Sequence, residues 1–269
     1  MNKTSLAIGV FDSGMGGLTV LRSLRQALPE ESFIYLGDTA RLPYGTKSSD
    51  TVKQYAMQMA RVLVERRIKA LVIACNTATT AALPHLQTIL PDMPVLGVVS
   101  PGAGAAIAAT RNKRIVVLAT ETTIAANTYS KLITAKLPDA FIRARACSLL
   151  VALAEEGMVD NRIARETLLH YLTDVGDEDT ILLGCTHFPV FKPLLSTILP
   201  VGVSVVDSAD ATAEVLKQLL TEYQLLKPSK ASAPFVRYLV TDSVSRFQRV
   251  GELFLKEPLL ISDIELVDV

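Results

Sequence analysis

The sequence has few residues that bind metals or form disulfides. It contains three cysteines and only three histidines in 269 residues. The cysteines are far apart and form no CxxC motif, which excludes a disulfide framework and is typical of a protein from a reducing cytosol. Only Cys185 and His187 have the spacing of metal ligands. Two ligands are too few for zinc, so we expect no bound metal.

The chain also has no excess of charge and no long apolar run. Lysine and arginine total 27, as do aspartate and glutamate, and no basic run is interleaved with aromatic residues. Nucleic acid is therefore not an expected partner. No stretch approaches the roughly 20 apolar residues that span a bilayer, and the run in MNKTSLAIGVFDSG is too short for a signal peptide. We expect a cytoplasmic protein that does not bind membranes.

Short apolar runs alternate with segments of helical periodicity. This alternation favours an α/β protein with mostly parallel sheets. Runs such as ALVIA and TILLG are apolar throughout, as in strands covered on both faces of a sheet. The predicted strands are Leu6–Phe11, Phe33–Gly37, Ala70–Ala74, Val95–Val99, Arg114–Ala119, Phe141–Ala146, Thr180–Gly184 and Val203–Val206. Amphipathic helices are predicted at Asp50–Arg66, Ile124–Lys136 and Arg162–Thr173.

The chain contains an internal repeat. ALVIACNTATTAALPHLQTILP and TILLGCTHFPVFKPLLSTILP each comprise an apolar strand, a cysteine, polar residues and a helix ending in TILP. Asp12 precedes Cys75 by nearly the same distance as Thr120 precedes Cys185. Units of α/β structure resemble one another for physical reasons alone, but a cysteine shared at the same strand end goes beyond that. We predict two similar α/β domains related by a pseudo-two-fold axis, with the active site in the cleft between them.

The two repeated cysteines suggest a reaction. Ligands of open α/β sheets bind at the carboxyl ends of the strands, where both Cys75 and Cys185 lie. Two thiols on opposite walls of a cleft can remove a proton from one face of a carbon and deliver one to the other face, which is racemisation or epimerisation. His187 lies two residues after Cys185 and so points to the same side in extended backbone. Asp12, at the end of another strand, is placed to serve Cys75 in the same way.

Simpler interpretations compete with this one. A single strand-end cysteine is more often a packing residue, and we expect that of Cys147, which has apolar neighbours. His85 and His170 lie in helical patterns and are expected at the surface or near helix ends. DSGMGG is a possible phosphate loop, but it lacks both GxGxxG spacing and GK[ST]. The strand-end loops carry no arginine or lysine, so neutral donors and helix N-termini would hold a carboxylate.

Four motifs together resemble those of the glutamate racemases, members of the cofactor-independent amino-acid racemase superfamily. They are IGVFDSGMGGLTV, YLGDTARLPYGTKS, VIACNTATT and LLGCTHFP, in this order along nearly the whole chain. The resemblance implies interconversion of L- and D-glutamate without pyridoxal phosphate or metal, with Cys75 as the base for the D-isomer and Cys185 for the L-isomer. It also implies a homodimer that supplies D-glutamate for peptidoglycan.

The resemblance further implies site residues and domain limits. Catalytic support would come from Asp12, His187 and Glu155, although Ser148 and Ala152 stand where the family commonly has prolines near that glutamate. The first domain would comprise residues 1–97 and 208–269, and the second residues 98–207. The implied substrate contacts are Asp12, Ser13, Tyr44, Gly45, Asn76, Thr77, Thr120, Thr186 and His187.

Three alternatives remain open at this point. A racemase of aspartate or another acidic compound would share the same motifs. A non-enzymatic two-lobed binding protein would also close on an amino acid, but it would not need two thiols. A pyridoxal enzyme would need a Schiff-base lysine, and no lysine lies in the motifs at the strand ends.

Overall fold

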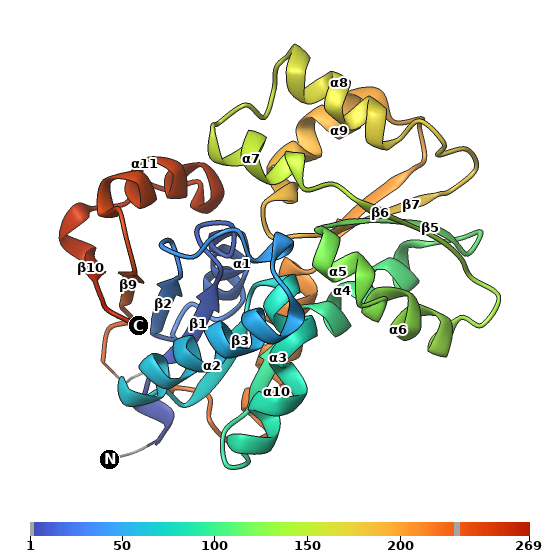
Figure 1. The fold of residues 1–269 in the computed structure, drawn as a ribbon. Coiled ribbons are helices and arrows are strands. Elements are labelled where there is room, and N and C mark those ends of the chain that lie inside the picture. Colours follow the sequence, from blue (N-terminus) through green and yellow to red (C-terminus); the bar gives the residue numbers. More distant parts are fainter. Residues whose placement is uncertain (1–2, 229–231) are drawn as a thin grey trace.

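The protein folds around two parallel sheets, as the computed structural model of residues 3–228 and 232–269 shows (Figure 1). The first sheet has the strand order β10-β9-β2-β1-β3-β4 and the second the order β6-β5-β7-β8. The predicted α/β class is confirmed. The strands are β1 Ile8–Asp12, β2 Phe33–Gly37, β3 Ala70–Ile73, β4 Val95–Gly97, β5 Arg114–Ala119, β6 Phe141–Ala146, β7 Thr180–Gly184, β8 Ser204–Asp207, β9 Val236–Val240 and β10 Ile264–Leu266.

Within the described residues, one helix follows each strand from β1 to β9, except that two helices follow β5 and two follow β6. They are α1 Leu18–Ala27, α2 Ser49–Glu65, α3 Asn76–Ile89, α4 Val99–Ala109, α5 Glu121–Ala125, α6 Thr128–Lys136, α7 Leu149–Glu155, α8 Arg162–Tyr171, α9 Lys192–Ile198, α10 Ala209–Glu222 and α11 Val244–Leu255. Short 3-10 turns, η1 to η4, occupy Lys3–Ser5, Tyr44–Thr46, Phe188–Phe191 and Ile261–Asp263. Among the described residues, no helix combines the length and the hydropathy needed to cross a membrane.

Two of the three predicted helices were correct to within two residues, but the third is divided. The single helix predicted over 124–136 is interrupted between α5 and α6. Asn127 adopts a left-handed conformation there, with φ 56°. Asparagine tolerates this region better than most residues, so the chain changes direction at that point.

The strand order confirms the internal repeat. The order β2-β1-β3-β4 in the first sheet is matched by β6-β5-β7-β8 in the second, with β1 equivalent to β5 and β3 equivalent to β7. The first sheet is extended at its β2 edge by β9 and β10, which the sequence reasoning did not predict. Since β3 and β7 occupy equivalent central positions, the residues that follow them, Cys75 and Cys185, are equivalent as well.

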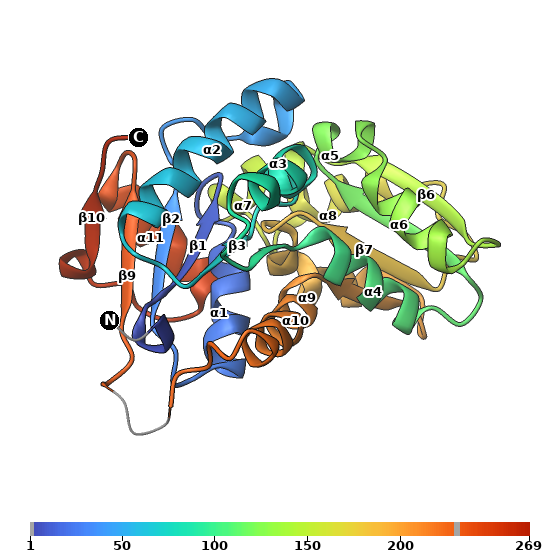
Figure 2. The same ribbon diagram turned by 90° about the horizontal axis from the view of Figure 1, so that it is seen from below.

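Helices cover both faces of the first sheet, as Figure 2 shows for α2 and α3 on one side and α1 and α10 on the other. Successive side chains along each strand point to opposite faces of the sheet. In β1, Val10 belongs to the core under α1, whereas Phe11 packs with the residues of α2 and α3. Both side chains are fully buried, and burying a side chain of this size contributes roughly 1.5–3 kcal/mol.

The second sheet is built in the same way. In β5, Val116 and Leu118 face the core that includes α7, α8 and α9, whereas Ile115 and Val117 face α4 and α6. One apolar cluster runs continuously from the α1 side of the first sheet to the α7 side of the second. The two sheets are therefore held in one packed unit, with the carboxyl ends of their central strands close together.

A buried ion pair lies at the other end of the first sheet, just before the first residues of β2 and β3. Lys69 Nζ lies 2.5 Å from Glu31 Oε2, and the two residues are 4% and 3% exposed. The same Nζ donates to the carbonyl oxygen of Leu225, and Glu31 Oε1 accepts from the backbone N–H of Lys227, each at 2.8 Å. These contacts secure the connection that leaves α10.

Candidate active site

The ends of β3 and β7 meet at a small cavity. It is lined by residues from both sheets and holds about 20 Å³, enough for about one water molecule. An amino acid needs more space, so binding one requires the walls to separate. The lining residues are Ser13, Leu42, Pro43, Tyr44, Gly45, Cys75, Asn76, Thr77, Thr120, Val151, Glu155, Cys185, Thr186 and His187.

Cys75 lies at the N-terminus of α3 and is held there by two contacts. Its Sγ accepts a hydrogen bond from the backbone N–H of Ala78 at 3.4 Å, and the thiol donates to Ser13 Oγ at 3.6 Å. Burial, reinforced by the negative charge of Asp12, raises the pKa of the Cys75 thiol to about 12. In this closed arrangement Cys75 is therefore a thiol at neutral pH.

Asp12 acts on Cys75 through its charge rather than through a hydrogen bond. Its carboxylate accepts from the backbone N–H of Gly14 at 3.0 Å and from the Thr186 hydroxyl at 3.3 Å. The residue is fully buried, and burial raises its pKa above the usual value, against the opposing effects of His187 and these hydrogen bonds. The predicted pairing of Asp12 with Cys75 is therefore indirect, and the residue in contact with the thiol is Ser13.

Cys185 has a different set of partners. His187 Nδ1 lies 3.9 Å from Cys185 Sγ, and Nε2 of the same ring lies 3.1 Å from Glu155 Oε1. Burial lowers the pKa of His187, but the hydrogen bonds to Cys185 and Glu155 outweigh it and raise the pKa to about 10. At neutral pH the ring is an imidazolium that donates to Glu155 on one side and to the sulfur on the other.

Helix α11, which packs beside the first sheet, contacts both His187 and Glu155. The Phe254 ring meets the His187 ring edge-on, with centroids 5.1 Å apart and the planes at 76°. Arg246 Nη2 lies 3.4 Å from Glu155 Oε2 and equally far from Glu156 Oε1. Burial raises the pKa of Glu155, but the contacts with His187 and then Arg246 lower it below the usual value overall. Glu155 is therefore ionised when His187 is protonated.

Hydroxyl and amide groups line the remaining wall. The Thr77 hydroxyl lies 2.9 Å from that of Thr120 and 3.1 Å from that of Thr123, so the helix after β3 contacts the loop after β5. Asn76 accepts a hydrogen bond from Tyr129, while its Nδ2 has no partner among the described residues. A buried donor without a partner is costly, so this side of the cavity is suited to a ligand with acceptor oxygens.

Two glycines let the loops of the two sheets approach. A Cβ atom at Gly16 would lie 2.4 Å from His187 Nδ1, and one at Gly45 would lie 2.5 Å from Thr120 Cβ. Any larger residue would separate the loops. Each glycine comes from the first sheet and faces a residue that follows a strand of the second, so the close approach at these two points requires a position without a side chain.

Comparison with known proteins establishes the family. Residues 8–216 match the family model described as Asp/Glu/Hydantoin racemase. The chain belongs to this family. A glutamate racemase of Geobacter metallireducens is 47% identical over 93% of this chain and 92% of its own. The resemblance to glutamate racemases predicted from the four motifs is thereby confirmed, and the chain is an amino-acid racemase.

Solved structures of the family agree with this fold. The glutamate racemase of Bacillus anthracis matches with a TM-score of 0.92 and 35% identity, over 99% of this chain and 98% of its own. The enzyme of Francisella tularensis, solved in complex with D-glutamate, matches with a TM-score of 0.90 and 36% identity over 98% of both chains.

The residues predicted for the site of this racemase lie close together. All of them line the cavity except Asp12, which accepts a hydrogen bond from the lining residue Thr186. Cys147 is fully buried in the apolar core, with its thiol 3.5 Å from the carbonyl oxygen of Arg145. His170 is exposed in the last turn of α8, and His85 is half-buried in α3.

Several residues at the site were missed from the sequence. Asp38 follows β2 and accepts hydrogen bonds from the Tyr44 hydroxyl and from Arg41 Nε. The strand-end rule that selected Asp12 would have found it, because both acids end neighbouring parallel strands. Tyr129 and Arg246 gave no such signal, since they lie inside helices far along the chain and reach the site only through the fold.

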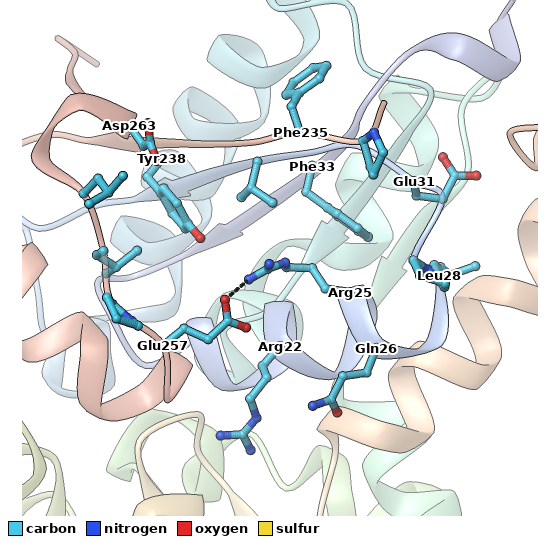
Figure 3. Close-up of a pocket in the computed structure, with 16 residues that line it drawn as sticks. Arg22, Arg25, Gln26, Leu28, Glu31, Phe33, Phe235, Tyr238, Glu257 and Asp263 are labelled. Atoms are coloured by element: carbon cyan, nitrogen blue, oxygen red, sulfur yellow. Dashed lines mark hydrogen bonds and ion pairs between the residues drawn. The ribbon is translucent and has the colours of Figure 1, made fainter. Parts of the chain in front are cut away.

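A larger hollow lies away from these residues, between α1 and the β9–β10 edge of the first sheet (Figure 3). It has a volume of about 520 Å³. Arg25 reaches across it to Glu257 at 2.9 Å, as the dashed line in Figure 3 marks. The hollow holds neither of the repeated cysteines, so the small cavity between the sheets is the better candidate for the active site. The described residues contain no group of three or more His, Cys, Asp or Glu placed to hold a metal ion.

Proposed function

We propose that this racemase interconverts L- and D-glutamate by a two-base mechanism in which Cys75 and Cys185 are the acid and base. The observation that carries the proposal is the equivalence of the two thiols. Each follows the same central strand of its own sheet, and both line one cavity. A substrate between them would present opposite faces of its α-carbon to the two sulfur atoms.

The proton balance follows from this placement. With L-glutamate bound, the Cys185 thiolate removes the α-proton and becomes a thiol. The electron pair left on the α-carbon is delocalised into the adjacent carboxylate. The Cys75 thiol then delivers its proton to the opposite face and becomes a thiolate. The product is D-glutamate, and the enzyme is ready for the reverse direction, in which Cys75 is the base.

His187 and Asp12 prepare the two thiols differently. The imidazolium of His187 lies beside Cys185, the sulfur that would take the α-proton of the L-isomer. Asp12 places a negative charge near Cys75 and keeps that sulfur protonated until it is needed as the acid. The substrate ammonium group would offset the Asp12 charge. The two sulfur atoms thus have neighbours of opposite charge, His187 for Cys185 and Asp12 for Cys75.

Neutral donors would hold the substrate carboxylates. Asn76, Thr77 and Thr186 line the cavity, and the N-terminus of α3 adds backbone N–H groups beside Cys75. The cavity lining contains no arginine or lysine side chain within the part of the chain that is described. Weak, distributed donors avoid holding the ground state too tightly relative to the carbanion. The other implied contacts are Ser13, Tyr44, Gly45 and Thr120.

The wider setting of the enzyme belongs to the same proposal. Residues 1–97 and 208–269 would form one domain and residues 98–207 the other, leaving aside residues 1, 2 and 229–231, which lie outside the described residues. Between these domains the cavity opens for the substrate. We infer that the enzyme is a cytoplasmic homodimer that needs neither metal nor pyridoxal phosphate and supplies D-glutamate for peptidoglycan.

The decisive experiment uses purified protein freed of metals and cofactors. Optical rotation of L-glutamate should decay to zero, and in D₂O the product should carry deuterium at the α-carbon from the first turnover. Cys75→Ser and Cys185→Ser should each lower kcat by at least about 10³-fold, whereas the matched control Cys147→Ser should retain activity. Near wild-type racemisation by either of the first two variants would rule out the two-base mechanism.

Parallel substrates and reagents separate the other possibilities. Faster turnover of aspartate than of glutamate would place the chain among racemases of another acid. Tight glutamate binding that survives thiol alkylation, without any racemisation, would indicate a binding protein. A yellow protein whose activity requires pyridoxal phosphate would point to a Schiff-base mechanism.

A further inference from the structure

Asn76 and Tyr129 form a hydrogen bond between the two sheets' helices. Asn76 is the first residue of α3, directly after Cys75, and Tyr129 lies in α6 beside the second sheet. The Tyr129 hydroxyl lies 2.6 Å from Asn76 Oδ1, and both residues are 3% exposed. Tyr129 does not line the cavity, so it acts there only through Asn76.

The direction of this hydrogen bond determines how the amide is oriented. The buried Tyr129 hydroxyl has Asn76 as its one hydrogen-bond partner within the described residues. If the amide were reversed, Nδ2 would donate to the tyrosine oxygen and the hydroxyl hydrogen would be left unpaired. Tyr129 therefore selects the orientation in which Oδ1 is occupied and Nδ2 is the free group.

The free group suits the substrate only in this orientation. A carboxylate is an acceptor, so it gains a hydrogen bond from Nδ2 but is repelled by Oδ1. We propose that Tyr129 is a positioning residue that keeps the Asn76 amide turned so that its NH₂ group donates to a substrate carboxylate. This inference rests on the proposed function, because it assigns the free donor to glutamate.

The tyrosine ring is held firmly enough for this task. A Cβ atom at Gly102 would lie 2.9 Å from the Tyr129 hydroxyl, and one at Gly184 would lie 2.8 Å from Tyr129 Cε2. Both glycines therefore leave the space that the ring occupies. Gly184 directly precedes Cys185, so the same ring packs against the strand that positions the second thiol. The hydroxyl can move little without a shift of β7 or α4.

The equivalent residue in the other half makes a contact of the same kind. Thr186 follows Cys185 as Asn76 follows Cys75, and its hydroxyl donates to Asp12 at 3.3 Å, again across the two sheets. Each residue after a repeated cysteine is thus oriented by a group from the opposite half. Tyr129 can orient the Asn76 amide only when the two walls of the cavity are in contact. Closure of the cavity is therefore coupled to recognition of the carboxylate.

A double-mutant cycle tests the proposal. Tyr129→Phe keeps the ring and removes only the hydroxyl. We expect it to lower kcat/KM for glutamate about tenfold, mainly by raising KM, and to raise the inhibition constant of glutarate, an unreactive dicarboxylate, by a similar factor. Asn76→Ala should lower kcat/KM at least as much. In the Asn76→Ala background, Tyr129→Phe should change kcat/KM by less than twofold.

The outcomes separate this proposal from the function on which it rests. If the wild type does not racemise glutamate, the proposed function fails. If the wild type is active but Tyr129→Phe keeps full kcat/KM, or loses about tenfold in the Asn76→Ala background as well, then Tyr129 does not act through Asn76. Tyr238→Phe, at another buried tyrosine in β9 (Figure 3), should leave kcat/KM unchanged. Thermal unfolding of each variant checks that the fold is retained.

Discussion

The Nε2 atom of His187 lies 3.1 Å from the Oε1 atom of Glu155, although 32 residues separate them along the chain. This contact joins the loop after β7 to the last residue of α7. It fixes the ring so that Nδ1 faces Cys185. Cys75 has no equivalent imidazole, and its thiol contacts Ser13 instead. The two equivalent sulfur atoms therefore work with unequal partners.

Replacement of Glu155 by glutamine should make the His187 imidazolium easier to deprotonate. The carboxylate is one of the groups that raise the pKa of His187 to about 10, so the pKa should fall in the variant. We expect kcat to drop by roughly 10²-fold, the lower end for loss of acid–base assistance. Steady-state kinetics in both directions measure this. Glu156→Gln, at the exposed neighbour that also contacts Arg246, is the matched control and should retain activity.

The same variant should show a pH-dependent loss of stability. A raised histidine pKa stabilises the folded state fully below the unfolded value of 6.5, and this contribution disappears as pH rises through about 10. The stability difference between wild type and Glu155→Gln should therefore be largest at pH values below 6.5 at which Glu155 is still ionised, and it should shrink towards pH 10. Urea unfolding across this range measures it. A difference independent of pH would mean that His187 is not protonated in the folded state.

Arg246→Gln should shift the acid limit of the enzyme to higher pH. The guanidinium group is one of the contacts that lower the pKa of Glu155, so without it the carboxylate is protonated at a higher pH. A lowered carboxylate pKa stabilises the fold above the unfolded value and is lost as pH falls through the folded value. Acid unfolding should therefore begin at a higher pH in the variant. The fall of kcat/KM on acidification should also begin at a higher pH.

A lysine at the same position provides the control for charge. Arg246→Lys keeps the positive charge, and it should restore most of the acid limb. A merely structural role would lower stability equally at all pH values. Equal acid limbs for the wild type and Arg246→Gln would show that α11 does not influence Glu155.

Gly45→Ala should hinder closure of the cavity. The added Cβ atom would lie 2.5 Å from Thr120 Cβ, far inside van der Waals contact, so the two walls must separate. We expect KM to rise by about tenfold or more. The free energy of unfolding should change by less than the free energy that corresponds to this change in KM. Gly104→Ala is the matched control, because a Cβ atom there meets nothing within 4 Å. It lies inside α4 and should stabilise the fold by about 0.4–1 kcal/mol. A KM for Gly45→Ala equal to that of the control would exclude close approach at this point.

Lys69→Met should destabilise the fold without affecting the chemistry. It leaves the buried Glu31 carboxylate without its cation, and breaking one side of a buried ion pair costs about 3–5 kcal/mol. Urea unfolding at neutral pH gives this difference. We expect kcat to be unchanged at temperatures where the variant is folded, since Lys69 is absent from the cavity lining. A loss below about 1 kcal/mol would show that Glu31 finds other compensation.

The predictable part of this structure was the part that the sequence repeats. Continuous apolar runs as short as β3 and β7, with 4 and 5 residues, favour strands in a covered sheet, because helices are usually longer. The cysteines after them could be placed in space from the rule that ligands lie at strand ends. That rule and the motif resemblance together predict most of the residues that line the cavity, but not Leu42, Pro43 and Val151.

What could not be predicted depends on distant parts of the chain coming together. The strands β9 and β10 lie at a sheet edge, and their short runs resemble loops. The break at Asn127 results from a local backbone preference that a helical pattern hides. Tyr129 contacts Asn76, 53 positions away, and Arg246 contacts Glu155, 91 positions away. A periodic sequence pattern cannot predict such distant contacts.

The shared strand order of the two sheets is the order that duplication of a half-length chain would produce. A chain of half this length, with one sheet and one strand-end thiol, could pair with its own copy and present the same sulfur from both sides of a common cavity. In such a symmetric ancestor both thiols would have identical surroundings, so neither would be prepared as the base. Duplication and fusion would free the halves to diverge, placing Asp12 near one sulfur and His187 beside the other. The differences between the halves are then the record of that specialisation.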